Sequence, residues 1–422
     1  MSTLTDPPET TGAVLRRIAA SALLPALVYE IGNGAIAPII ALVALAAGAS
    51  TSVAGLMLSM GGIGRILGDL PSAAVIDRVG DRRAMLLASG LTGVALLACW
   101  LDPALWMLAL SQLVIGMCSA VFYLARQTYI SEVVALHQRA RALSTLAGAH
   151  RVGLFIGPFI GAAAIHFWGT RSAFGVAVAA TVLTALILFV VPDQEAAGDR
   201  PPAHRGGTSM WGMFGRHRKL FLSLGTAVVL VGAVRAARQT VLPLWASHIG
   251  LSATATSLIF GIANAADMSL FYPAGHAMDR YGRLAVAIPA MTLLGVGMVA
   301  IPAAHGPLVL GVVAVVMSIG NGIGSGIMMT IGADAAPPDD RTAFLSVWRL
   351  LSDTGNAAGP LIPAAIASVA ALGLGISVTG LIGLGAAVAL SRWVPYYSPY
   401  ATRAMARAHR EQQAQERLSS PS

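Results

Sequence analysis

The sequence predicts an all-α integral membrane protein with twelve transmembrane helices, arranged as two pseudo-symmetric bundles of six. Three observations support this prediction: the composition, a set of twelve long apolar runs, and a repeat at one fixed offset. Of the 422 residues, 56% are hydrophobic and 11% are charged, and the mean hydropathy is +0.73. Soluble domains carry about 25% charged residues, so a soluble helical protein is a poor alternative.

Apolar runs long enough to cross a bilayer occur twelve times, since about 20 helical residues make one crossing. They lie at 18–45, 52–76, 84–101, 105–131, 143–166, 172–191, 220–247, 253–277, 284–302, 307–333, 342–369 and 373–392. The first run is too long for a signal-peptide core and lacks a clear cleavage site. We therefore expect it to be the first transmembrane helix.

The distribution of Lys and Arg predicts the orientation of the chain. When the loops are assigned alternately to the two sides, 20 Lys and Arg residues fall on the side of the N-terminus and Arg171 alone falls on the other. Cytoplasmic loops are enriched in Lys and Arg, so both termini are expected in the cytoplasm. The same bias accounts for the net charge of +8, and we expect no nucleic-acid partner.

The runs and loops divide the chain into five segments. These are a cytoplasmic N-terminal tail (1–17), an N-terminal six-helix bundle (18–191), a cytoplasmic linker (192–219), a C-terminal six-helix bundle (220–394) and a cytoplasmic C-terminal tail (395–422). Within the linker, the stretch from Met210 to Leu220 is either a short amphipathic helix on the membrane surface or unstructured. The tail from Tyr396 onward is expected to be solvated.

The two halves share motifs at an offset of 202 residues. The motifs are Pro71-x5-Asp77-Arg78-x-Gly80 with Pro273-x5-Asp279-Arg280-x-Gly282, and Gly153-x3-Gly157-Pro158 with Gly355-x3-Gly359-Pro360. Internal repeats fix architecture, and parallel repeats related by an axis along the membrane normal are typical of secondary transporters.

These motifs resemble those of the major facilitator superfamily, and the resemblance extends over the whole apolar length of the chain. The string from Ala73 to Arg83 is similar to the loop between spans two and three of that family, although Ala73 is usually Gly and Asp81 is usually basic. The resemblance implies the major facilitator fold and a gating loop at the cytoplasmic ends of the bundles. A tight turn with positive-inside charge is the alternative. The gating residues so implied are Asp77, Arg78, Gly80, Arg82, Asp279, Arg280, Gly282 and Arg283.

The fifth span carries a second family motif. Gly153, Gly157, Pro158 and Gly161 are similar to the helix-bend motif of proton-coupled efflux members. Spaced glycines allow close helix packing, and Pro removes a backbone hydrogen bond. Ordinary small-residue packing is the alternative. The Arg that efflux members carry early in span four is Gln112 here, which leaves the coupling mechanism open.

Ionisable residues inside the spans are functional-site candidates, because each costs at least about 2.5–3.5 kcal/mol to insert. There are ten: Glu30, Arg65, Asp69, Arg126, Arg151, Arg235, Arg238, Asp267, Arg349 and Asp353. Spans 3, 6, 9 and 12 have none, and the resemblance implies that these four spans are peripheral and face lipid.

The repeat places opposite charges at equivalent positions, because Arg65 aligns with Asp267 and Arg151 with Asp353. In the resembled fold, span two packs on span eleven and span five packs on span eight. We therefore hypothesise that Arg65 pairs with Asp353 and that Arg151 pairs with Asp267, bridging the bundles. Permanent struts and contacts that exchange during transport both remain open.

The candidate proton-coupling residues are Glu30, Asp267 and Asp353, with Glu30 preferred. Glu30 lies near the middle of the first span. A carboxyl that is removed from water takes up a proton more readily than an exposed one. A permanent ion pair of Glu30 with Arg235 or Arg238 is the alternative.

A solute cavity is expected near the midplane between the bundles. Six embedded Arg against four embedded acids favour anionic or zwitterionic solutes, because guanidinium groups match carboxylate and phosphate. Arg126 can instead extend to the membrane surface, and the neutral side chains can serve as contacts between helices. The candidate lining residues are Tyr29, Glu30, Asn33, Arg126, Arg235, Arg238 and Asn321.

The predicted function is secondary active transport by alternating access, and the chain is not expected to be an enzyme. The preferred form is proton-coupled efflux of small amphipathic organic compounds. The alternative is a proton-linked importer or facilitator of an organic anion, and a non-transporting membrane sensor is a third, less favoured class.

The expected partners are a small-molecule substrate, protons and the lipid bilayer. The chain has no GxxxxGK[ST] loop for ATP, and its nine His are scattered, so we expect no cofactor and no metal. We expect a monomer in a bacterial inner membrane.

Overall fold

The computed structural model describes residues 16, 18–101, 104–134, 136–191, 210–337 and 341–419. These residues form helices joined by short turns, with no β-strand among them. The predicted linker is described only from residue 210 onward, and the predicted N-terminal tail only at residue 16.

The N-terminal half contains the six predicted spans, the first of them in three pieces. Its elements are η1 (Ala19–Leu23), α2 (Leu24–Ile36), α3 (Ile40–Ala46), α4 (Thr51–Val79), α5 (Asp81–Leu101), α6 (Leu105–Val133), α7 (Leu136–Trp168) and α8 (Ser172–Val190). The first span is interrupted at Pro38, whose ring cannot supply a backbone donor to a continuing helix.

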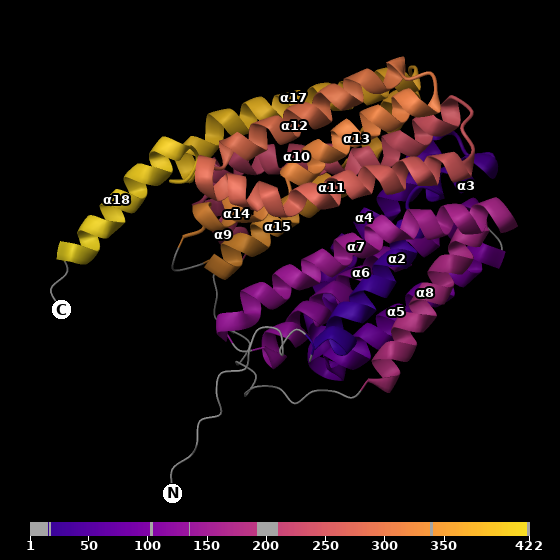
Figure 1. Cartoon of the computed structure of the whole chain (residues 1–422), viewed down its shortest axis with the longest axis horizontal. Helices are drawn as coiled ribbons and strands as arrows, with labels where there is room; N and C mark the ends of the chain where they lie inside the picture. The colour runs from indigo at the N-terminus through magenta and orange to yellow at the C-terminus, as the bar shows by residue number, and fades with distance from the viewer. Residues whose placement is uncertain are drawn as a thin grey trace, which may run out of the picture.

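The C-terminal half contains the other six spans, together with a short helix before them and a longer one after them. Its elements are α9 (Met210–Arg216), α10 (Arg218–His248), α11 (Ala253–Tyr281), α12 (Leu284–Ala300), η2 (Ile301–Ala303), α13 (Pro307–Ile323), α14 (Ile327–Ala335), α15 (Arg341–Ala358), α16 (Leu361–Ala367), α17 (Leu372–Tyr397) and α18 (Arg403–Ser419). Figure 1 shows the two halves side by side, the N-terminal half in indigo and magenta and the C-terminal half in pink to yellow.

The repeat is visible in how equivalent helices begin and end. The hydroxyl of Ser50 accepts a hydrogen bond from the amide of Val53 at 3.3 Å, and that of Ser252 accepts one from the amide of Ala255 at 3.2 Å. Each Ser therefore caps its helix, α4 or α11. Both helices also end at a glycine in the left-handed region, with φ of +84° at Gly80 and +96° at Gly282. A side chain at either turn would be strained.

The helices account for twelve membrane crossings, as predicted. By length and composition alone, ten of the described helices or joined helix pairs could span a membrane. The other two crossings are α11 and the pair α15–α16, which carry polar residues such as Asn264 and Asp353 at the contact between the halves. They are less apolar because they face the other half rather than lipid alone.

Four helices turn apolar side chains outward, as expected for the lipid-facing spans 3, 6, 9 and 12. Val94 on α5 is 66% exposed, Phe189 on α8 is 74% exposed and Val388 on α17 is 67% exposed, while Val296 on α12 is 51% exposed. Such side chains would be unfavourable in water but suit a hydrocarbon environment, so the chain is a multi-pass membrane protein.

Helix α9 packs on the C-terminal half. Met213 is fully buried, and the ring of Phe214 stacks on that of Phe221 on α10 at a centroid distance of 5.5 Å. The stretch is therefore helical, as one of the two alternatives proposed, but it ends at Arg216 and contributes to the core.

The C-terminal tail is also more ordered than predicted. Ser398 and Ala401 are buried, and the amides of Arg283 and Leu284 donate hydrogen bonds to the carbonyl oxygens of Tyr400 and Ala401, both at 3.0 Å. The prediction of a solvated tail from Tyr396 is wrong for these residues, because backbone pairing attaches them to the turn between α11 and α12. Helix α18 then extends away from the bundle (Figure 1).

Candidate functional site

The two halves pack tightly at the end of the molecule where α4 and α11 begin, here called the far end. The hydroxyl of Ser52 on α4 donates a hydrogen bond to the carbonyl oxygen of Ala364 on α16 at 2.8 Å. A methyl group added to Gly55 would lie 2.3 Å from Ala364 Cβ, and one added to Gly261 on α11 would lie 2.7 Å from the ring of Phe159 on α7. The far end is therefore closed.

The opposite end, where α9 and α18 lie, is here called the linker end (Figure 1). On the two facing helices, α7 and α11, a methyl group added to Gly148 or Gly275 would meet no atom within 4 Å. The seam between the halves thus opens toward the linker end.

A cavity of about 180 Å³ lies where the closed and open parts of the seam meet. Its polar lining comes from both halves, and several lining residues lie near the midpoints of their helices. Asp267 is the middle residue of α11, and Arg151 is next to the middle residue of α7. The lining residues are Gly34, Ala37, His150, Arg151, Leu154, Arg235, Arg238, Gln239, Asn264, Asp267, Met268 and Asn321.

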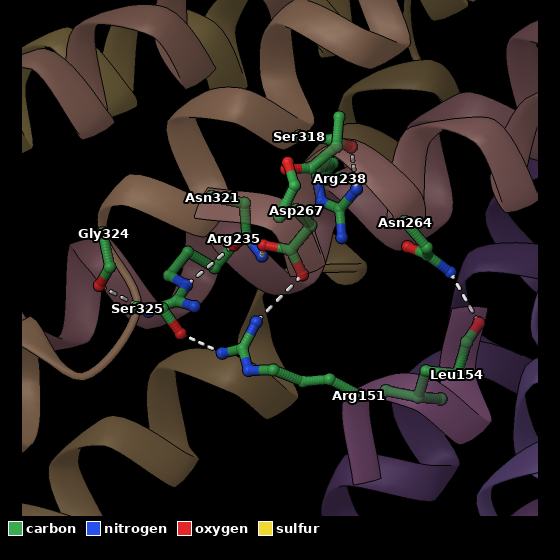
Figure 2. Close-up of polar contacts among 12 residues, drawn as sticks. Arg151, Leu154, Arg235, Arg238, Asn264, Asp267, Ser318, Asn321, Gly324 and Ser325 are labelled. Carbon is green, nitrogen blue, oxygen red and sulfur yellow. Dashed lines mark hydrogen bonds and ion pairs between the residues drawn. The ribbon is translucent and has the colours of Figure 1, made fainter. Parts of the chain in front are cut away.

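Arg151 crosses this cavity from α7 to the other half. Its Nη1 lies 3.3 Å from Oδ2 of Asp267, its Nη2 donates a hydrogen bond to the hydroxyl of Ser325, and its guanidinium lies 4.3 Å from the ring centroid of Phe271. Figure 2 shows this side chain reaching from the N-terminal half to Asp267 and Ser325. The expected pair Arg151–Asp267 is therefore present.

Two further Arg side chains from α10 lie on the same side of the cavity, and neither forms an ion pair with another described residue. Arg235 Nε donates to Asn321 Oδ1 at 2.9 Å, while Asn321 Nδ2 donates to Asp267 Oδ1 at 3.0 Å. Arg238 Nη1 donates to the hydroxyl of Ser318 at 2.7 Å, and its Nε is buried without a hydrogen-bond partner. The cavity thus holds three guanidinium groups and one Asp carboxylate (Figure 2).

Glu30 lies beside the cavity in the N-terminal half and is 1% exposed. Its carboxylate accepts hydrogen bonds from the hydroxyl of Tyr123 at 2.7 Å and from Asn33 Nδ2 at 3.2 Å. His150 Nδ1 lies 2.9 Å from Oε1, but the ring is not aligned to donate a hydrogen bond. No Arg forms an ion pair with Glu30 among the described residues, so the proposed permanent pair with Arg235 or Arg238 is wrong.

The glycines of the helix-bend motif fix the position of α7 against α2. A methyl group on Gly153 would lie 2.5 Å from Glu30 Cβ, and one on Gly157 would lie 2.5 Å from the carbonyl oxygen of Ile31. Gly161 is packed against Ala35 in the same way, at 3.0 Å from its carbonyl oxygen. Close backbone contact of this kind requires small residues, and here it brings His150 to Glu30.

The second expected ion pair is absent. Asp353 Oδ2 lies 3.6 Å from Arg349 Nε on its own helix, and Arg349 Nη2 lies 3.2 Å from Asp69 Oδ1 on α4. Arg65 lies over the ring of Tyr123 at 5.4 Å from the centroid, and its Nε is buried without a hydrogen-bond partner. Arg349 therefore bridges the halves at this point, in place of the predicted pair Arg65–Asp353.

Two expected cavity residues lie elsewhere. Tyr29 is 1% exposed, and its hydroxyl lies 3.3 Å from that of Thr92 and 3.2 Å from that of Ser119, inside the N-terminal half. Arg126 is 6% exposed and lies 5.0 Å from the ring centroid of Tyr123, so it does not extend to the membrane surface. Arg235, Arg238 and Asn321 do line the cavity, while Glu30 and Asn33 lie behind it.

The two copies of the expected gating loop differ. Asp77 and Arg78 in the first copy are exposed, and Arg82 Nε donates to the carbonyl oxygen of Leu188 at 2.6 Å. In the second copy, Arg283 lies 3.2 Å from Asp279 and 3.0 Å from Asp334.

The charge of Arg283 is well supported by these contacts. Burial alone would lower the pKa of Arg283, but its hydrogen bonds to the carboxylates of Asp334 and Asp279 outweigh burial and raise that pKa. The hydroxyl of Ser398 in the tail also donates to Asp334, at 2.7 Å. The second copy is therefore tied to the C-terminal tail through Asp334 and Ser398.

Sequence reasoning missed His150, Tyr123 and Gln239. His150 and Tyr123 contact Glu30, and Gln239 lines the cavity. A signal for His150 was present, because it precedes Gly153 by three residues and so shares the helix face that packs on α2. Tyr123 has no comparable signal, since its role depends on how α6 is rotated.

The chain is similar to proteins of one family. The family model described as "Major Facilitator Superfamily" matches residues 23–360 and, in a second match, 224–418. Human "Solute carrier family 2, facilitated glucose transporter member 10" is 28% identical over 344 residues, which cover 74% of this chain. The chain spans 63% of the length of that relative.

Solved structures show the same fold. A D-xylose-proton symporter has a TM-score of 0.68 at 16% identity, over 90% of this chain and 98% of that one. A bacterial homolog of the human lysosomal transporter Spinster, in an inward-facing and unoccupied conformation, has a TM-score of 0.69 at 15% identity, over 95% of this chain and 98% of that one. At these identities, the likeness concerns the fold alone.

Proposed function

The chain belongs to the Major Facilitator Superfamily, and from this premise we propose that it is a proton-coupled secondary transporter of small organic anions or zwitterions. The superfamily consists of transporters, so the chain is a membrane transporter and not an enzyme. The choice of solute and the coupling to protons are our proposal, and they rest on the cavity.

The charge balance of the cavity carries the proposal. Arg151, Arg235 and Arg238 line it, and Asp267 is the acid among its lining residues. Asp267 already pairs with Arg151, so the two α10 guanidinium groups are held by neutral partners. A bound carboxylate or phosphate would supply the missing negative charge, and guanidinium groups bind both in a two-pronged geometry. A lipophilic cation would meet repulsion there.

Alternating access would connect the two sides of the membrane. The excess of Lys and Arg at the linker end supports placing that end in the cytoplasm, and the cavity would then open inward. A proton on Asp267 would remove the charge that holds Arg151 across the seam, which would let α7 separate from α11. The halves could then rock around the cavity and open the far end.

Proton-coupled efflux of small amphipathic compounds is a second candidate. It is favoured by the helix-bend motif, whose glycines Gly153 and Gly157 pack α7 on α2, and by the apolar part of the cavity wall, which includes Leu154 and Met268. The two candidates differ in the chemical class of the solute. They share the fold, the proton and the cavity.

The test is transport by the full-length protein in liposomes with an imposed pH gradient. The probes are radiolabelled monocarboxylates, dicarboxylates and phosphate monoesters, with a lipophilic organic cation for the efflux candidate. We expect gradient-driven movement of at least one anion, and a loss of at least about tenfold in its apparent affinity in Arg238→Gln, since 1.4 kcal/mol of binding corresponds to tenfold. The exposed Arg392, outside the cavity, provides the matched control Arg392→Gln.

Two results would reject the proposal. Gradient-driven movement of the cation with none of the anions would favour the efflux candidate. Movement of anions at the same rate with and without the pH gradient, and under either gradient direction, would identify a facilitator without proton coupling.

A further inference from the structure

His150 lies between the cavity and the buried carboxyl of Glu30. It is among the lining residues of the cavity, and 33% of its side chain is exposed. On its other side, Nδ1 is buried and lies 2.9 Å from Glu30 Oε1, while Glu30 is 1% exposed. One imidazole ring therefore touches both the cavity and a carboxylate that is closed off from it.

We propose that His150 is the residue that carries protons between the cavity and Glu30. The inference deepens the proposed proton coupling and rests on it. Tyr123, Asn33 and His150 are the side chains in polar contact with Glu30 among the described residues. Of these three, only imidazole changes its charge near neutral pH.

The two ring nitrogens of His150 divide the task. A proton from cavity water binds the nitrogen that is free in the neutral ring, and the ring becomes an imidazolium. The Nδ1 proton then passes to Oε1 of Glu30, so that the ring returns to neutral and Glu30 becomes a neutral acid. No other protein bond forms or breaks in this transfer. The ring regains its first tautomer by proton exchange with cavity water: Nε2 releases its proton, and Nδ1 takes one up after the ring turns it toward the cavity. Because the ring is not aligned with Glu30 in this conformation, a small rotation precedes the transfer.

The ring lies among charged groups of both signs, with the Glu30 carboxylate on one side and guanidinium groups around it. The titratable and charged groups facing His150 are Glu30 on α2, Tyr123 and Arg126 on α6, Arg65 on α4 over Tyr123, Arg151 on α7, Arg235 and Arg238 on α10, and Asp267 on α11.

The position of His150 also links the two candidate coupling carboxylates. Its neighbour Arg151 binds Asp267 in the other half. A proton that moves from the cavity to Glu30 through His150 therefore passes directly beside Arg151, whose contact with Asp267 holds the halves together. Protonation of Glu30 and release of Arg151 would act on the same turn of α7.

The experiment is a rapid pH drop on the full-length protein, followed by infrared absorption and without any solute. The protonated-carboxyl band that disappears in Glu30→Gln reports Glu30. We expect this band to form at least about tenfold more slowly in His150→Gln than in the wild type, since positioned proton transfer contributes about 10²–10⁴-fold. The matched control is His166→Gln, an exposed histidine on the same helix, which should leave the rate unchanged.

A purely structural role of His150 would change the pH at which the band is half formed but not its rate of formation. An unchanged rate in His150→Gln overturns the inference. If that variant does not fold, the same measurement on the wild type tests the inference. In a relay, the infrared bands of the imidazole must change before the Glu30 band. Simultaneous changes, or the reverse order, would reject the relay. A wild type without gradient-driven transport would reject the proposed coupling but leave the proton path measurable.

Discussion

Two ion pairs cross between the halves among the described residues, Arg151–Asp267 and Asp69–Arg349, with contacts of 3.3 and 3.2 Å. They differ in environment. Arg151 and Asp267 are 18% and 16% exposed, whereas Arg349 is 51% exposed. An exposed pair contributes little to stability, so the Arg151–Asp267 contact is the one that matters for holding the seam at mid-depth.

Reversing both charges of this pair tests its role. Arg151→Asp alone should destabilise the protein by about 3 kcal/mol, because it leaves two carboxylates facing each other in the seam. The double variant Arg151→Asp with Asp267→Arg should recover most of that loss but transport poorly, since the proton would now bind on the wrong helix. The measurement is thermal unfolding in detergent together with gradient-driven uptake. Normal stability and transport in both single variants would show that the pair has no role.

The sequence predicted one of these pairs and missed the other for a reason of side-chain direction. The repeat and the fold place positions 151 and 267 at equal depth on facing helices, and both side chains point into the seam. At the other contact, Arg349 lies one turn from Asp353 on the same helix and reaches it first. Spacing along the chain shows which residues share a depth, but not which rotamer each one takes.

At the scale of elements, α7 is the helix that joins the functional groups. One face of α7 packs on α2 through its glycines, and its adjacent residues His150 and Arg151 reach opposite halves. The glycines are therefore not needed for flexibility here. They allow two backbones to approach closely enough for His150 to contact a buried carboxylate.

Substitution of a glycine on the face of α7 that packs on α2 should lower the stability of the protein, whereas substitution on another face of α7 should not. Gly157→Ala would place a methyl group 2.5 Å from the carbonyl oxygen of Ile31, so we expect a loss of about 1–3 kcal/mol from overpacking. The control on the same helix is Gly148→Ala, where nothing lies within 4 Å, and we expect a neutral effect or a gain of up to about 1 kcal/mol. Thermal unfolding measures both. Equal effects would contradict the close packing of α7 on α2.

The twelve helices were predictable from apolar length, but their interruptions were less so. The first span breaks into α2 and α3, and the tenth breaks into α13 and α14 at a turn that contains Gly326 with φ of +79°. Apolar content reports that a segment crosses lipid. At a break, backbone N–H and C=O groups lose their partners within the helix and must be hydrogen-bonded or buried by neighbouring helices. The sequence of a single segment does not contain that information.

For the whole molecule, the far end is closed by tight packing at Gly55 and Gly261 and by the hydrogen bond from Ser52 to Ala364, and the linker end is open. The linker end is open because facing positions on α7 and α11 are not packed together: a methyl group added to Gly148 or Gly275 would meet no atom within 4 Å. The repeat in the sequence predicted that the two halves are equivalent. It gave no information on the state of the seam, because both states use the same helices and differ only in which ends meet.

If the far end is a gate, a bond across it should stop transport without closing the linker end. The double variant Ser52→Cys with Ala364→Cys places two thiols where Ser52 now donates a 2.8 Å hydrogen bond to the backbone of Ala364, so the two residues are near the spacing of a disulfide. The native Cys99 and Cys118 are buried and should not interfere. We expect oxidation to abolish gradient-driven transport and reduction to restore it.

The linker end supplies the matching readout for that gate. Gly275→Cys, at a position where an added side chain meets no atom within 4 Å, should react with a thiol reagent at the same rate before and after the far end is crosslinked, because locking the far end holds the seam open there. Ser52→Cys alone, treated with the same oxidant, should transport normally. Full transport by the crosslinked protein would mean that solute passes without separation of α4 from α16, and the far end would then be a fixed contact rather than a gate.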